Sequence, residues 1–220
     1  MFYELVIFDL DGTLLDTISD LADSLNHALV LSGFPERSVE EVKSFVGNGI
    51  RRLIVRGVPD TAGEAETDKV YRDFTEYYEL HCADKTKPYA GVRELLCRLR
   101  SEGVLTAVVS NKADYAVQDL CRKYFDGLLD MAQGEREGVR RKPYPDSVNG
   151  VIERLGADRG RSIYIGDSEV DIETAENAGL KSIIVDWGFR DRGFLESCGA
   201  KCIVSSPEDI LTELVTIHRL

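Results

Sequence analysis

The segment from which the fold follows is Leu5-Val6-Ile7-Phe8-Asp9-Leu10-Asp11-Gly12-Thr13. Four consecutive apolar residues are typical of a strand that is buried on both faces, as in a parallel sheet. The run ends at Asp9, and Gly12 allows the backbone to turn directly behind it. Two carboxylates therefore follow the end of a buried strand, and we expect a functional site there.

Apolar runs alternate with helical patterns along most of the chain, which predicts an α/β fold with a parallel, Rossmann-like sheet. Helical patterns with one apolar face lie between the runs. The further strand candidates are Leu105–Val109, Ile163–Ile165 and Ile183–Val185, with weaker ones at Leu128–Met131 and Cys202–Val204.

The alternation stops between Asp16 and Lys87, where helical patterns occur without a convincing strand. Within this part, Ser38-Val39-Glu40-Glu41 has the sequence of a helix capping box. We therefore predict a catalytic core from residues 1–15 and 88–220 and an inserted α-helical cap domain from residues 16–87. Ligands of open parallel sheets bind beyond the carboxyl ends of the strands, so an insertion at this point can cover the site.

The composition is that of a globular protein, with 220 residues, 43% hydrophobic and 30% charged. A net charge of −12 and the lack of a basic stripe argue against nucleic acid as a partner. We expect a cytoplasmic protein without membrane contact, because no export signal and no apolar run near the roughly 20 residues of a membrane span is visible. Five cysteines that lack the close pairing of a zinc knuckle or redox motif predict reduced thiols. The oligomeric state stays open between monomer and homodimer.

Polar residues follow three of the predicted strands: Asp9 and Asp11, Ser110-Asn111-Lys112, and Gly166-Asp167-Ser168. A single acidic residue after a strand is more often a turn residue or a helix cap than a catalytic group. Neighbouring parallel strands, however, would bring these three groups to one edge of the sheet. Carboxylate oxygens of this kind suit Mg²⁺, which would offset their mutual repulsion.

This arrangement predicts phosphoryl transfer. A carboxylate such as Asp9 can attack phosphorus and split hydrolysis into two displacements through an aspartyl-phosphate. Asp11 can give a proton to the leaving alcohol and then accept a proton from the attacking water.

The phosphoryl oxygens need positioned donors and positive charge. Ser110, the backbone of Asn111 and Lys142 are the candidates. Taken alone, the run Arg140-Arg141-Lys142 is more typical of a solvated basic loop. Its place before Pro143, ahead of the Asp167 strand, favours a functional role.

Four segments in this order resemble the haloacid dehalogenase superfamily of phosphatases, and they span nearly the whole chain. The helical insertion after the first motif is similar to the small α-helical cap of that family. The resemblance implies a Mg²⁺-dependent phosphatase acting on a small phosphorylated metabolite. The segments are Asp9-Leu10-Asp11-Gly12-Thr13-Leu14, Val109-Ser110-Asn111-Lys112, Lys142-Pro143 and Gly166-Asp167-Ser168-Glu169-Val170-Asp171.

The resemblance also implies roles for the carboxylates. Asp9 is the nucleophile and a metal ligand, and Asp11 is the acid and base that binds the metal through its backbone carbonyl. Asp167 is the remaining protein ligand. Asp171 would support the metal site or Lys142 from behind.

The same resemblance places the phosphate-binding groups. Ser110 and Asn111 would bind the phosphate, and Lys142 would neutralise both the nucleophile and the phosphate. Gly12 and Thr13 are expected beside the substrate, where Thr13 would also hold the turn.

Within the superfamily, the likeness is strongest to phosphoglycolate phosphatases, through Phe45-Val46-Gly47-Asn48-Gly49-Ile50 and Ser110-Asn111-Lys112. Asn48 and Gly49 either contact the substrate or form only a turn between two helices. Arg51 either meets a substrate carboxylate or is a solvated helix arginine. Related proteins act on other sugar phosphates, nucleotides or pyrophosphate with similar motifs, so the substrate stays open.

Three other functions fit parts of the pattern. A β-phosphoglucomutase-like phosphomutase shares Asp9 and Asp11 but returns the phosphoryl group to a sugar, so isomerisation without phosphate release would identify it. A non-catalytic regulator could keep the fold, although all four motifs are intact here. A nucleotide-binding oxidoreductase is disfavoured because no Gly-x-Gly-x-x-Gly turn follows the first strand.

Overall fold

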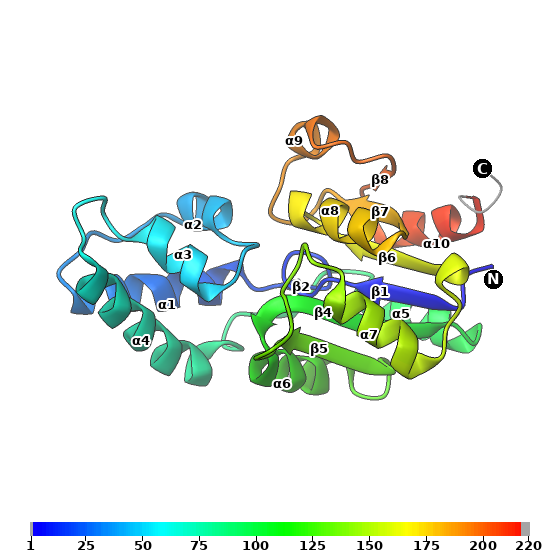
Figure 1. Cartoon of the computed structure of the whole chain (residues 1–220), viewed down its shortest axis with the longest axis horizontal. Helices are drawn as coiled ribbons and strands as arrows, with labels where there is room; N and C mark the ends of the chain where they lie inside the picture. The colour runs from blue at the N-terminus through cyan, green and yellow to red at the C-terminus, as the bar shows by residue number, and fades with distance from the viewer. Residues whose placement is uncertain (1, 217–220) are drawn as a thin grey trace. The chain divides into compact units, whose positions relative to one another are not determined.

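The computed structural model describes residues 2–216. The chain forms two compact units (Figure 1). One, the core unit, comprises Met1–Leu15 and Pro88–Leu220, and the other, the helical unit, comprises Asp16–Lys87. The strands β2 (Leu15–Asp16) and β3 (Lys87–Pro88) pair where the chain leaves and re-enters the core unit.

The core unit contains a six-stranded sheet with the order β5-β4-β1-β6-β7-β8, in which each neighbouring pair is parallel. Strand β1 lies inside the sheet, which explains why all four of its residues are apolar and buried. This arrangement confirms the predicted α/β class. The strands are β1 (Leu5–Phe8), β4 (Leu105–Ala113), β5 (Met131–Glu135), β6 (Ser162–Gly166), β7 (Lys181–Val185) and β8 (Ile203–Val204).

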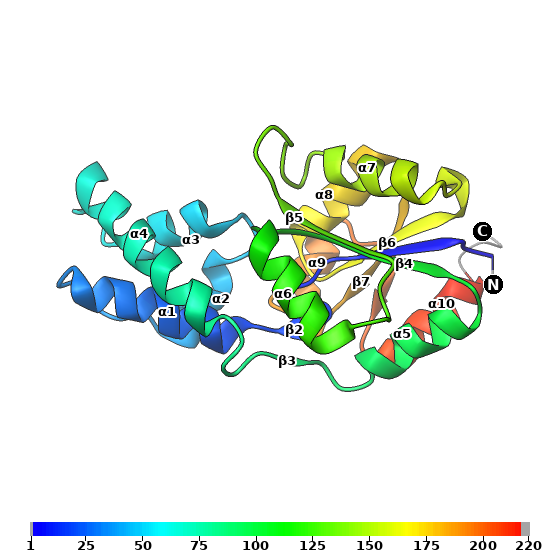
Figure 2. The same cartoon turned by 90° about the horizontal axis from the view of Figure 1, so that it is seen from below.

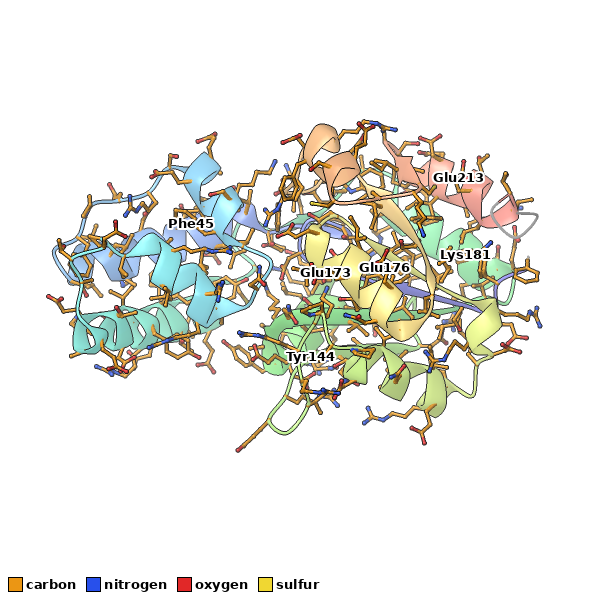
Figure 3. All side chains as sticks on the ribbon, turned by 45° about the horizontal axis from the view of Figure 1, so that its top comes forward. Phe45, Tyr144, Glu173, Glu176, Lys181 and Glu213 are labelled. Carbon is orange, nitrogen blue, oxygen red and sulfur yellow. The ribbon has the colours of Figure 1, made fainter. Side chains whose placement is uncertain are left out.

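Helices cover both faces of this sheet, with α7 and α8 on one side and α5, α6 and α10 on the other (Figure 2). Each turns an apolar stripe inward, and the exposed face of α8 carries Glu173 and Glu176 (Figure 3). The helices are α5 (Val92–Ser101), α6 (Asp114–Phe125), α7 (Asp146–Leu155), α8 (Glu169–Ala178), α9 (Arg192–Ser197) and α10 (Pro207–Thr216), with a 3₁₀ turn at Arg159–Arg161.

The helical unit contains α1 (Ile18–Leu31), α2 (Val39–Phe45), α3 (Ile50–Gly57) and α4 (Glu64–His81), and α1 packs against α4. The predicted capping box at α2 is present, because Ser38 and Glu41 exchange side-chain hydrogen bonds with each other's backbone N–H. Asp20 is buried and accepts hydrogen bonds from the backbone of Lys85 and Thr86, at 2.9 and 2.8 Å. Asp20 thus ties the start of α1 to the segment that leads back to the core unit.

One predicted strand lies at a different place in the chain. The prediction was Leu128–Met131, whereas β5 begins at Met131. The residues before it are held by β4 side-chain and backbone groups, since Thr106 Oγ1 donates to the Leu128 carbonyl and Thr106 N–H donates to the Asp130 carboxylate. Within residues 2–216, no helix combines the length and apolar character needed to cross a membrane.

Candidate active site

The strand register explains why the predicted site residues meet. Phe8 of β1 lies beside Val108 of β4 on one side and Ile165 of β6 on the other. The three strands run in the same direction. Asp9 and Asp167 directly follow β1 and β6, and Ser110 lies in the second half of β4, so the three residues come to the same edge of the sheet. All three residues are buried, with 8%, 6% and 1% of their surfaces exposed.

Lys142 enters this cluster from the loop between β5 and α7. Its ammonium lies 2.9 Å from Asp9 Oδ1 and 2.7 Å from Asp171 Oδ1, and it donates to the Tyr164 hydroxyl at 3.0 Å. Burial alone would lower the pKa of Lys142, but the carboxylates of Asp171 and Asp9 raise it well above its usual value. The interpretation of Lys142 as part of a solvated basic loop is therefore wrong. Lys142 is a buried cation paired with Asp9, the predicted nucleophile.

The carboxylates at this edge repel one another. Asp9, Asp167 and Asp171 each present one oxygen within 4.8 Å of the others. Burial raises the pKa of Asp9 to about 7, with Lys142 opposing that rise and Asp171 and Asp11 adding to it. Burial and the charges of Asp171 and Asp9 also raise the pKa of Asp167 well above its ordinary value. Crowded, buried carboxylates of this kind fit a divalent cation, which would stabilise their ionised forms.

Asp171 is saturated by protein donors. Its Oδ1 accepts from Lys142 and from the Tyr164 hydroxyl at 3.1 Å, while its Oδ2 accepts from Ser168 Oγ at 2.6 Å and from the backbone N–H groups of Ser168 and Asp167. These bonds leave Asp9 and Asp167 as the carboxylates suited to a cation. Asp171 orients Lys142 and the start of α8.

Asp11 lies outside the three-carboxylate cluster. Both of its carboxylate oxygens accept from the Lys112 ammonium, at 2.9 and 3.2 Å. Lys112 belongs to the motif Ser110-Asn111-Lys112, but its contact with Asp11 was not predicted from the sequence. The sequence could have indicated that Lys112 lies in the site, because this residue stands two positions after Ser110 near the end of a buried strand.

The turn after β1 shapes the position of Asp167. Thr13 Oγ1 donates to Asp167 Oδ1 at 3.1 Å. Gly12 has a φ of 86°, in the left-handed region that favours glycine, and a Cβ there would lie 2.3 Å from Asp167 Oδ2. Both residues, predicted beside the substrate, are in contact with the candidate metal ligand.

Two further predicted residues sit on β4. Ser110 Oγ accepts from the backbone N–H of Lys112 at 3.3 Å, and Asn111 Nδ2 donates to the Lys142 carbonyl at 3.1 Å. Asn111 therefore fixes the loop that carries Lys142. Phosphate binding by Ser110 and Asn111 stays a prediction.

The remaining predicted contacts lie in the helical unit. Asn48 and Gly49 connect α2 to α3, and Gly49, with a φ of 79°, is the residue before α3. Arg51 pairs with Asp68 of α4 at 2.5 Å, and both side chains are exposed. Substrate binding by these residues stays a prediction.

The loop after β7, residues 186–190, contacts the carboxylate of Asp167. This contact was not predicted from the sequence. Phe189 N–H donates to Asp167 Oδ2 at 2.8 Å, and Trp187 Nε1 donates to the Thr13 carbonyl at 3.1 Å. Gly188 lies between them, where a Cβ would be 2.4 Å from Asp167 Oδ2 and 2.5 Å from the Gly12 carbonyl. Only glycine fits this approach without displacing one of these groups.

We expect Gly188→Ala to weaken activation by divalent metal and to lower activity by roughly 10- to 100-fold, because it displaces a group that orients a ligand. The metal concentration for half-maximal activity would measure this effect. Gly150→Ala is the matched control, since nothing lies within 4 Å of its Cβ in helix α7, and it should leave activity unchanged. Wild-type metal activation in Gly188→Ala would show that the loop does not position Asp167.

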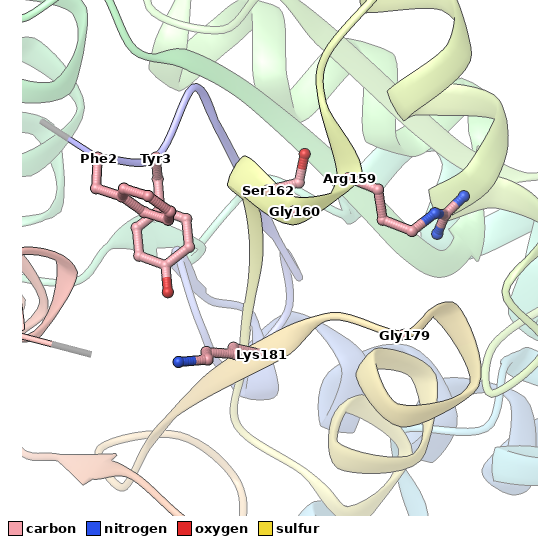
Figure 4. A pocket seen from close by; sticks show the side chains of 7 residues that line it. All are labelled: Phe2, Tyr3, Arg159, Gly160, Ser162, Gly179 and Lys181. Atoms are coloured by element: carbon pink, nitrogen blue, oxygen red, sulfur yellow. The ribbon is translucent and has the colours of Figure 1, made fainter. Parts of the chain in front are cut away.

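A separate cavity of about 260 Å³ opens at the other end of the strands. Ser162 and Lys181, which begin β6 and β7, help to line it together with Tyr3. Figure 4 shows the Tyr3 hydroxyl and the Lys181 side chain directed toward the same space. The cavity is distinct from the carboxylate cluster, whose members follow the strands instead of preceding them.

Comparison with known proteins places this geometry in a family. Residues 6–185 match the family model of the haloacid dehalogenase-like hydrolases. A phosphoglycolate phosphatase from Mesorhizobium japonicum is 36% identical over 86% of this chain and 85% of its own length. An N-acetylmuramic acid 6-phosphate phosphatase from Pseudomonas aeruginosa is 29% identical over 95% and 93%.

A solved structure is similar to this chain over nearly its whole length and carries a related name. It comes from Lactobacillus delbrueckii subsp. bulgaricus, is assigned provisionally as a phosphoglycolate phosphatase and superposes with a TM-score of 0.91. It is 39% identical and covers 96% of this chain and 97% of its own. The chain therefore belongs to the haloacid dehalogenase-like hydrolase family and is a phosphoric monoester hydrolase.

Proposed function

We propose that the protein is a Mg²⁺-dependent phosphatase that hydrolyses small phosphate monoesters through an aspartyl-phosphate on Asp9. The observation that carries this proposal is the buried ammonium of Lys142, which is paired with Asp9 and Asp171, two of the three converging carboxylates. Asp9 and Asp167 would hold Mg²⁺ with the backbone carbonyl of Asp11. When bound, the cation offsets the repulsion between the nucleophile and the dianionic phosphate.

In the first step, a carboxylate oxygen of Asp9 attacks phosphorus while the bond from phosphorus to the ester oxygen breaks. Lys142 holds the carboxylate of Asp9 in place and balances the negative charge that gathers there. Asp11, whose carboxylate lies outside the cluster, gives its proton to the leaving alkoxide. The alcohol departs and the phosphoryl group stays on Asp9.

In the second step, water attacks the phosphorus of the aspartyl-phosphate. Asp11, now ionised, takes a proton from that water, and the bond from phosphorus to Asp9 breaks. Inorganic phosphate leaves, and both carboxylates return to their starting protonation states. The same residue thus serves as acid and then as base.

Phosphoglycolate is the substrate that we place first, because relatives at 36% identity over most of both chains carry that name. N-acetylmuramic acid 6-phosphate is a second candidate, supported by the relative that aligns over nearly the whole chain. We further propose that the helical unit acts as a cap that selects among such esters, with Asn48, Gly49 and Arg51 as candidate contacts.

The test is phosphate release from a panel of monoesters, including phosphoglycolate and a hexose phosphate, before and after metal removal. We expect EDTA to stop phosphate release and added Mg²⁺ to restore it, because Asp9 and Asp167 repel each other without a cation. Undiminished activity after exhaustive metal removal would contradict the proposal. Isomerisation of the hexose phosphate with a bisphosphate primer, without phosphate release, would identify a phosphomutase instead.

A further inference from the structure

Lys112 is a second buried lysine at the catalytic edge, and it differs from Lys142 in its partner. Its side chain is 3% exposed, and its ammonium binds both carboxylate oxygens of Asp11. Lys142 is held instead between Asp9 and Asp171. One lysine thus lies beside the proposed nucleophile and the other beside the proposed acid.

We infer that Lys112 binds a carboxylate carried by the leaving group and so makes the enzyme selective for phosphate esters of short hydroxy acids. This inference rests on the proposed function, because it uses Asp11 as the proton donor. The backbone N–H of Lys112 also donates to Ser110 Oγ, which keeps the residue next to the proposed phosphate-binding hydroxyl.

The chemistry of the leaving group gives the reason. Asp11 must approach the ester oxygen closely to protonate it, and the Lys112 ammonium is 2.9 Å from Asp11 Oδ1. In an ester of a 2-hydroxy acid, the carboxylate carbon is two bonds from that same oxygen. A carboxylate at this point therefore comes within reach of Lys112, which can contact Asp11 and the substrate together.

Charge favours the same assignment. The chain carries a net charge of −12, and four aspartates surround this edge of the sheet. A substrate with a phosphate and a carboxylate would be repelled there unless a cation met each anionic group. Lys142 and the bound metal would face the phosphate, and Lys112 would face the carboxylate. An ammonium supplies the required point charge and hydrogen-bond donors.

The experiment compares two esters that differ at one group: 2-phosphoglycolate and 2-hydroxyethyl phosphate, in which a hydroxymethyl group replaces the carboxylate. We expect wild type to prefer phosphoglycolate in kcat/KM. Lys112→Met should lower kcat/KM for phosphoglycolate by roughly 100-fold and for 2-hydroxyethyl phosphate by less than about 10-fold. Lys112→Arg, which keeps the charge, should recover part of the preference.

Each alternative has its own outcome. An equal loss for both esters would show that Lys112 only positions Asp11, and no loss for either would also overturn the inference. If Lys112→Met fails to fold, judged by its thermal melt, Lys112→Gln replaces it in the same comparison.

The inference and the proposed function can fail separately. A wild-type enzyme that releases phosphate from esters but shows no preference for carboxylates would end the inference alone. If wild type released phosphate from no ester, the proposed function would fail. Calorimetric binding of phosphoglycolate to wild type and Lys112→Met would then still decide whether Lys112 contacts the carboxylate.

Discussion

Replacing Asp9 with asparagine is expected to abolish turnover, lowering kcat by roughly four orders of magnitude or more, while the protein stays folded. The amide nitrogen and oxygen keep the shape of the side chain but cannot attack phosphorus. Stability should not fall, because burial disfavours the charge of Asp9, which raises the pKa of this carboxyl to about 7. Phosphate release and the thermal melt measure the two effects, and wild-type activity would refute the assignment of Asp9 as nucleophile.

The stability of this variant should also depend on pH in a defined direction. The pKa of Asp9 rises from 3.8 to about 7 on folding, so the folded protein binds a proton that the unfolded chain has lost between these values. Without metal, the wild type therefore loses stability as the pH rises from about 4 toward 7. Asp9→Asn lacks this contribution. Its melting temperature should therefore rise relative to that of the wild type as the pH increases over the same range. A difference in melting temperature between the two proteins that stays constant across these pH values would contradict the raised pKa of Asp9.

Replacing Lys142 with methionine is expected to damage both activity and stability. The substitution leaves Asp9 and Asp171 buried without their shared cation, and breaking a buried ion pair from one side costs about 3–5 kcal/mol of unfolding free energy. Activity should fall by roughly 1,000-fold or more, because the nucleophile loses its fixed position and the phosphate loses a positive charge. Denaturant unfolding and phosphate release measure the two losses.

Two controls separate these effects. Lys201→Met replaces an exposed lysine and should change neither quantity. The double variant Lys142→Met/Asp171→Asn removes one of the uncompensated charges, so it should regain part of the stability but none of the activity. Wild-type activity in either variant that lacks Lys142 would remove this residue from the mechanism.

Strong local patterns made much of the core predictable. The run Leu5–Phe8 is typical of a strand buried on both faces, and its register beside β4 and β6 brings Asp9, Ser110 and Asp167 to one edge. The capping box at Ser38 was equally explicit, because two short-range hydrogen bonds define it. The apolar run and the capping box depend on neighbours in the chain, which is why the sequence reveals them.

Contacts between distant segments were not predictable in the same way. Phe189 binds Asp167 through its backbone N–H, which every residue except proline could supply, so its side chain gives no signal. Tyr164 stands within the apolar strand β6, and only the fold shows that its hydroxyl meets Lys142 and Asp171. The start of β5 was misplaced because Leu128 is apolar but its carbonyl is bound by the Thr106 side chain instead of a strand neighbour.

The phosphoryl group that Asp9 is proposed to carry can be trapped and located directly. The variant Asp11→Asn lacks the base for the second step, and an aryl phosphate needs no acid for the first because its leaving group is already a stable anion. After acid quench, mass spectrometry of this variant should find a phosphate group on the peptide that contains Asp9, and hydroxylamine should remove it. Release of phosphate without such a labelled peptide, or a label on another residue, would contradict the mechanism.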